Sequence, residues 1–119
     1  MYRQGDVAII PMDLFKETFP ETSTEKETQV KRDKGRVVLA YGEVTGHAHA
    51  IADPHVEMWT MLGAKDNAAP GNDNDRILHC LDEVQLDHEE HETIKLPAGL
   101  YVVRRQREYG PEELRTVAD

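Results

Sequence analysis

Cysteine is nearly absent from this chain of 119 residues, in which Cys80 is the single example. One thiol forms no disulfide within the chain, and the sequence contains no CxxC pair for zinc binding or redox chemistry. Leu78 and Leu81 flank this thiol, and an apolar setting favours a buried small residue over a reactive one. The sequence therefore excludes a disulfide scaffold.

Long apolar runs are missing as well. No segment approaches the ~20 apolar residues that a membrane-spanning helix needs. Residues 1–6 lack the basic region and the following apolar region of a secretory signal peptide. We therefore expect a cytoplasmic protein that has no membrane as a partner.

Basic residues are in the minority, with 14 Lys and Arg against 23 Asp and Glu, so the formal net charge is −9. This charge repels a phosphate backbone, and we expect no long nucleic acid as a partner. Apolar residues make up 39% and charged residues 31% of the chain, which is polar for a packed monomer. That composition predicts either loops and tails or a homo-oligomer in which another subunit completes the apolar surface.

Short apolar segments separated by turn residues run through the chain. They predict strands at residues 7–10, 36–41, 47–51, 55–61, 76–80, 82–86, 93–96 and 100–107. Without a long amphipathic helix, this pattern is typical of a mainly β fold, a small barrel or sandwich with little helix. We expect one domain over residues 1–109, with a mobile loop at 20–35 and a C-terminal tail at 110–119.

The histidines are confined to one part of the sequence, since all six lie between positions 47 and 91. Strand periodicity places His47 and His49 on the same face, where two imidazoles can hold one metal ion. Gly42 and Gly46 precede this pair and allow a close approach of the backbone. His47 and His49 are therefore candidate metal ligands, and the alternatives are a structural hydrogen-bonding pair or chance exposure to solvent.

A second pair, His88 and His91, encloses Glu89 and Glu90. On a strand the two imidazoles would point to opposite faces, whereas a tight turn or a single helical turn brings them together. The carboxylates are candidates for ligation, for orienting a histidine or for general-base catalysis. An acidic, solvated turn is the competing interpretation.

The other histidines and the basic strip near the C-terminus complete the set of candidates. We expect His55 to lie in a loop and His79 in the core or an interface, both outside the site. Arg105 belongs to the strip at residues 104–107. This strip is an edge strand that is protected by its charge and paired with carboxylates, or it turns one arginine toward the histidines, or it binds another subunit. In the second case Arg105 binds a small anionic ligand through bidentate hydrogen bonds.

In part, the chain resembles the cupins, which are small β-barrels with a metal inside. Four residues stand near the positions of the first cupin motif, a glycine, His-x-His and then an acidic residue: Gly42, His47, His49 and Asp53. The turn of the second motif resembles residues 97–99, but Val102 stands where that motif has its histidine. The resemblance implies that His88 or His91 supplies the missing ligand.

A closer likeness is to small uncharacterised bacterial and phage proteins. The shared motifs are GEVTGHxH, which is residues 42–49 here, and HEEH…LPxGxY…QREY, which falls within residues 88–109. The likeness spans most of the chain and implies membership of an uncharacterised family. It brings no activity with it.

Three functions stay open at this stage. We favour a non-catalytic binding or assembly module that holds a divalent metal, with zinc, iron, nickel and manganese all compatible. A metal-dependent enzyme, either a hydrolase or a catalyst of cupin-type oxygen chemistry, would use the histidines as ligands, Glu89 or Glu90 for protons and Arg105 for a small anionic substrate. A metal-free nuclease or phosphoesterase would use a histidine as base beside an arginine.

Overall fold

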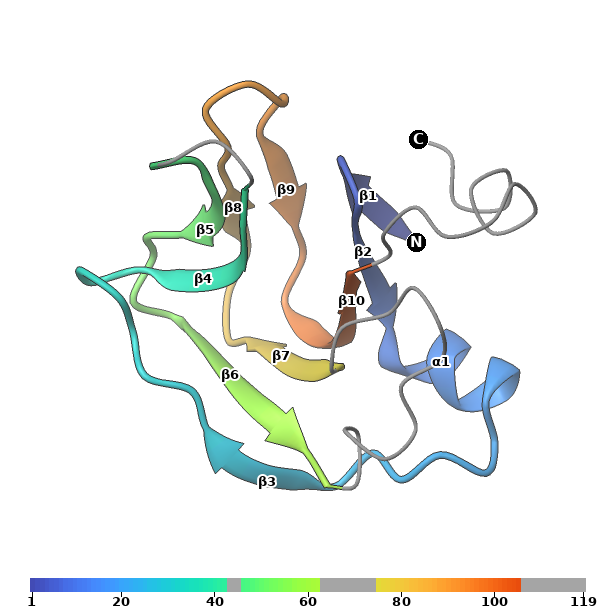
Figure 1. Cartoon of the computed structure of the whole chain (residues 1–119). Coiled ribbons are helices and arrows are strands. Elements are labelled where there is room, and N and C mark those ends of the chain that lie inside the picture. Colours follow the sequence, from blue (N-terminus) through green and yellow to red (C-terminus); the bar gives the residue numbers. More distant parts are fainter. Residues whose placement is uncertain (43–45, 63–74, 106–119) are drawn as a thin grey trace.

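The computed structural model describes residues 1–42, 46–62 and 75–105, and most of them lie in strands (Figure 1). Six strands form one antiparallel sheet in the order β1-β2-β10-β7-β6-β3. Their bounds are β1 (Tyr2–Gln4), β2 (Val7–Pro11), β3 (Lys26–Gln29), β6 (Val56–Met61), β7 (Arg76–Cys80) and β10 (Gly99–Arg105).

Two smaller antiparallel sheets contain two strands each. One pairs β4 (Val37–Tyr41) with β5 (Ala48–Ile51), and the other pairs β8 (Val84–Leu86) with β9 (Ile94–Leu96). The helix α1 (Met12–Thr18) follows β2 directly. Figure 1 shows the large sheet curving around the two small ones, with α1 on its outer side.

Strand β2 explains why both faces of the large sheet are covered. Its residues 7–10 are all apolar and buried, and successive side chains of a strand point to opposite faces. Val7 and Ile9 join the core cluster shared with the two small sheets, whereas Ala8 and Ile10 join a second cluster with Phe15 of α1. The molecule is therefore layered, with a helix, a large sheet and two small sheets.

This architecture confirms the predicted mainly β fold with little helix. The sheets of the described residues stay open and do not close into a barrel. Helix α1 was not predicted, because its buried residues Met12 and Phe15 fill too short a stretch to show a helical period. Within the described residues no helix is long and apolar enough to cross a membrane.

Two strands lie where no strand was predicted. Strand β1 precedes the Gly5–Asp6 turn, and β3 lies inside residues 20–35, with all four of its side chains exposed. The predicted strand at residues 47–51 begins at Ala48, so His47 stands just before it. Residues 106 and 107 of the last predicted strand and the predicted tail at 110–119 lie outside the described residues.

One backbone contact between the small sheets prepares the site. Ala50 of β5 and Asp87, which follows β8, form an isolated antiparallel bridge. The amide of Ala50 donates to the Asp87 carbonyl at 3.0 Å, and the amide of Asp87 donates to the Ala50 carbonyl at 2.9 Å. This bridge places His49 and His88, the neighbours of the two bridging residues, side by side.

Candidate functional site: a histidine pocket

Four separate parts of the chain meet at one pocket of about 210 Å³. They are the β1–β2 turn, the segment around the start of β5, the β8–β9 loop and the end of β10. The lining residues are Asp6, Gly42, His47, His49, His88, Glu90, His91 and Arg105. All four histidines proposed as ligands from the sequence, together with Glu90 and Arg105, thus face one space.

The rings of the histidines are in contact inside this pocket. The ring centroids of His49 and His88 lie 4.3 Å apart, and those of His88 and His91 lie 4.7 Å apart. The His47 ring meets the His88 ring edge-on at 5.7 Å. The segment that contains His88 and His91 therefore turns, as their joint participation requires.

A group of three donor atoms stands closest to the geometry of a metal site. His47, His88 and Glu89 each offer one ligand atom, and these atoms all lie within 4.8 Å of one another. The carboxylate of Glu89 accepts a hydrogen bond from the Ala48 amide at 2.9 Å. This hydrogen bond holds the pKa of Glu89 below its ordinary value and keeps the carboxylate charged.

The ring of His88 is held by the backbone of its own turn. Its Nδ1 accepts hydrogen bonds from the amides of Glu90 at 2.9 Å and His91 at 3.3 Å. A neutral His88 therefore carries its proton on Nε2. If His88 binds a metal through Nε2, that proton has to leave and the two backbone hydrogen bonds have to rearrange.

His49 has the opposite tautomer, and the reason is Gln4. The Gln4 side chain is 3% exposed, and its Nε2 donates to the carbonyls of Leu86 at 3.1 Å and Glu92 at 2.9 Å. Its Oε1 is therefore left to accept a proton from Nδ1 of His49, at 2.7 Å. Because Nδ1 holds the proton of the neutral ring, Nε2 of His49 carries a lone pair.

Burial keeps this ring uncharged. The loss of solvation lowers the pKa of His49 to about 4, and the nearby His88 lowers it further, whereas Asp6 acts in the opposite direction. His49 is 3% exposed. At neutral pH it is thus a neutral imidazole, the form that binds metals.

The pKa of His49 predicts a loss of stability in mild acid for the metal-free protein. The imidazole of His49 takes up a proton near pH 6.5 in the unfolded chain but only near pH 4 in the folded chain. Its contribution to the free energy of unfolding is therefore full above pH 6.5 and falls as the pH drops from 6.5 to 4. Between pH 7 and pH 5 the expected loss is about 2 kcal/mol from this group. Urea unfolding in the presence of a chelator measures it.

His49→Asn should remove most of this slope, since the Asn amide takes the place of Nδ1 and does not titrate. His55→Asn is the matched control, because the His55 side chain is 61% exposed. If the wild type, His49→Asn and His55→Asn all lost the same stability between pH 7 and pH 5, the low pKa of His49 would be contradicted.

Arg105 and Asp6 form an ion pair at the rim of the pocket. Nε of Arg105 donates to Oδ2 of Asp6 at 3.0 Å. Strand β10 lies between β2 and β7 in the large sheet, but its register with β7 ends at Val103, whereas Arg105 pairs with Val7 of β2. The expected pairing of these arginines with carboxylates is confirmed, because Arg104 also forms an ion pair with Asp75. The structure places Arg105 beside the histidines as well.

Gly42 shows the close approach that the sequence predicted. A Cβ at this position would lie 3.1 Å from the Cβ of His47. The amide of Gly42 also donates to the His47 carbonyl at 2.9 Å. Glycine thus lets the chain close tightly around the start of β5, which sets the position of His47.

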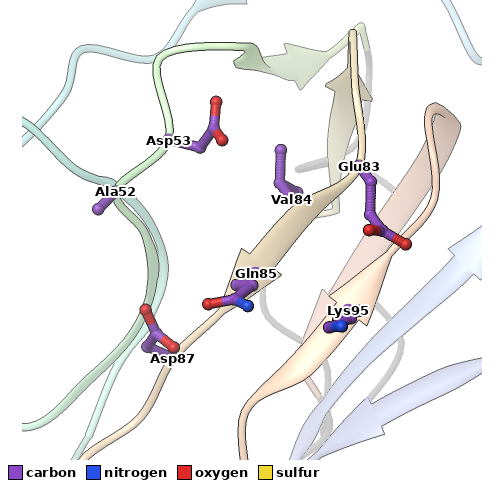
Figure 2. Close-up of a pocket in the computed structure, with 7 residues that line it drawn as sticks. All are labelled: Ala52, Asp53, Glu83, Val84, Gln85, Asp87 and Lys95. Atoms are coloured by element: carbon purple, nitrogen blue, oxygen red, sulfur yellow. The ribbon is translucent and has the colours of Figure 1, made fainter.

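The remaining candidates lie elsewhere. The exposed His55 pairs with Asp53 at 3.0 Å, and His79 lies on β7, opposite Glu57 and Leu100. Figure 2 shows Asp53 at a second pocket, which contains no histidine and is lined by Ala52, Asp53, Glu83, Val84, Gln85, Asp87 and Lys95. The acidic residue of the cupin-like motif therefore does not join His47 and His49.

Sequence reasoning missed Gln4 and Asp6, whose only signal was a turn next to Gly5.

Comparison with known families adds one result: residues 3–106 match the family described as a domain of unknown function, DUF8820. The chain belongs to this family. No curated protein and no solved structure matched the chain. Membership of DUF8820 agrees with the expected uncharacterised family, and the description of DUF8820 carries no activity.

Proposed function

We propose that this protein binds a divalent transition-metal ion through His47, His88 and Glu89. The observation that carries the proposal is the grouping of their donor atoms within 4.8 Å. Two imidazoles and one carboxylate suit zinc, nickel or iron better than magnesium or calcium, which prefer oxygen ligands. The metal would link the start of β5 to the β8–β9 loop.

The donor set fits such an ion after two adjustments: the donor atoms move closer together, and the two backbone hydrogen bonds to Nδ1 of His88 rearrange. Zinc bonds to nitrogen and oxygen are about 2.0–2.2 Å long, so two ligands at a tetrahedral angle lie about 3.4 Å apart. The separation of at most 4.8 Å therefore calls for a closure of at most about 1.4 Å. The carboxylate of Glu89 lies at the end of a flexible, exposed side chain, so it can supply this movement.

The test is a titration of chelator-treated protein with Zn²⁺, followed by calorimetry and by thermal unfolding. We expect saturable binding and a rise in the melting temperature, since an ion at 100 times its Kd stabilises the folded state by about 2.7 kcal/mol. The proposal would be refuted if Zn²⁺, Ni²⁺, Mn²⁺ and Fe²⁺ all gave no heat of binding and left the melting temperature unchanged.

A metal-dependent enzyme is the second candidate, and the incomplete ligand set favours it. Three protein ligands leave a position open on the ion, as in catalytic zinc sites. The bound ion would supply Lewis acidity, and the Arg105 guanidinium at the same pocket would orient a small anionic substrate. We would favour the enzyme over a binding module if the Zn²⁺-loaded protein hydrolysed p-nitrophenyl acetate or p-nitrophenyl phosphate and Glu89→Gln abolished this activity.

A further inference from the structure

Two electron-pair donors face each other in the histidine pocket without a proton between them. Nε2 of His49 lies 3.8 Å from Oδ1 of Asp6, which is too long for a hydrogen bond. Among the described residues no hydrogen bond to either atom is found, and Nε of Arg105 donates to the other oxygen of Asp6, Oδ2. The His49 side chain is 4% exposed, so its free nitrogen is directed into the pocket from a rigid position.

The lone pair on Nε2 follows from the fixed orientation of Gln4. If the Gln4 amide were flipped, its oxygen would face the carbonyls of Leu86 and Glu92, and both contacts would become repulsive. If the proton of His49 moved to Nε2, the bare Nδ1 would face Oε1 of Gln4 at 2.7 Å. Both alternatives leave buried acceptors in contact, so the observed arrangement is the stable one.

An acceptor pair of this kind is a site for a cation. We propose that Nε2 of His49 and Oδ1 of Asp6 bind a second divalent cation of the zinc class, separate from the group formed by His47, His88 and Glu89. Their 3.8 Å separation is close to the roughly 3.4 Å between two tetrahedral zinc ligands. In this arrangement Gln4 is a positioning residue, which acts on the cation through His49.

A third ligand is within reach at the same place. The His91 ring stacks over the His49 ring with a centroid distance of 5.8 Å. A Cβ at Gly5 would lie 2.8 Å from Nε2 of His91 and 3.3 Å from Cε1 of His49. The absence of a side chain at Gly5 thus lets the His91 ring lie this close to the His49 ring.

The two positions adjoin each other, since the ring of His49 in the second is tilted against the ring of His88 in the first, with their centroids 4.3 Å apart. Both rings line the histidine pocket, whereas Glu89 lies outside its lining. Pairs of divalent ions in one pocket bind an anionic oxygen between them. This inference extends the proposed function to a two-cation centre, yet the second position stands on its own contacts. The two proposals can therefore fail separately.

Zn²⁺ stoichiometry, measured by calorimetry and by elemental analysis after gel filtration, tests the second position. The wild-type protein should bind two equivalents, and His49→Asn and Asp6→Asn should each bind one. Asn at position 49 keeps the donor to Gln4 and removes only Nε2, while Asp6→Asn changes a side chain that is 36% exposed and leaves the core intact. His55→Asn and Asp13→Asn are the matched controls and should still bind two.

Imidazole ¹⁵N spectra add a second measurement. In the metal-free protein we expect His49 to show a protonated Nδ1 and a bare Nε2, and the Nε2 signal should shift when Zn²⁺ is added. If the wild type bound one equivalent, and this equivalent were lost in Glu89→Gln but kept in His49→Asn and Asp6→Asn, the second position alone would be overturned. One equivalent lost only in His49→Asn and Asp6→Asn would support it and overturn the first. Loss of all binding in His49→Asn would reduce the two positions to one shared site and overturn the inference.

Discussion

Glu89→Gln is expected to weaken Zn²⁺ binding at the first position by about 100-fold, which corresponds to about 2.8 kcal/mol. The amide oxygen of Gln is still able to accept the hydrogen bond from the Ala48 amide that holds the side chain at 2.9 Å. The substitution therefore removes the negative charge and leaves the shape and the main contact of residue 89 in place. Calorimetric titration of the chelator-treated variant measures the effect.

Glu92→Gln serves as the matched control for this experiment. Glu92 lies in the same loop and is exposed, but its side chain does not belong to the donor group. The affinity of the Glu92→Gln variant for Zn²⁺ should equal that of the wild type. If both variants bound Zn²⁺ as tightly as the wild type, Glu89 would not be a ligand, and the β8–β9 loop would be an acidic solvated turn.

Gln4→Leu is expected to destabilise the metal-free protein by about 3 kcal/mol, a large fraction of the stability of a small domain. The substitution removes the hydrogen bonds of Gln4 to three polar groups, namely Nδ1 of His49 and the carbonyls of Leu86 and Glu92. A buried group without its partner loses about 1–3 kcal/mol, and leucine offers no hydrogen bond in return. Urea unfolding in the presence of a chelator measures the change.

Gln85→Leu is the control, since Gln85 on β8 is exposed, and its effect should stay within about 0.5 kcal/mol. A double-mutant cycle with His49→Leu separates the pair from its surroundings, because removal of both partners costs less than the sum of the single changes. Strict additivity, or a Gln4→Leu variant as stable as the wild type, would show that Gln4 does not hold His49.

The sequence predicted the individual candidates well where the signal is local. The spacing of His47 and His49 and the joint occurrence of His88 and His91 gave four residues that the structure brings to one pocket. It did not predict their separate roles. His47 stands with His88 and Glu89, whereas His49 faces Asp6, although the two histidines are only two residues apart.

Gln4 and Asp6 could not be found in this way, because their partners are distant along the chain. The hydrogen bond between Gln4 and His49 joins residues 45 positions apart, and the ion pair between Asp6 and Arg105 joins residues 99 positions apart. Neither residue stands in a pattern that a strand or helix period reveals. A buried glutamine is polar and looks like a surface residue until its partners are known.

By itself, the sequence determined the mainly β class and the stretch of chain that carries the histidines. Alternating and short apolar segments specify strands, and residue types specify which side chains are able to bind a metal. Only the tertiary structure decided which nitrogen of His49 carries the lone pair. That choice depends on the Ala50–Asp87 bridge and on the insertion of Gln4 between two carbonyls. These contacts join segments far apart in the chain, and local periodicity does not encode how such segments pack.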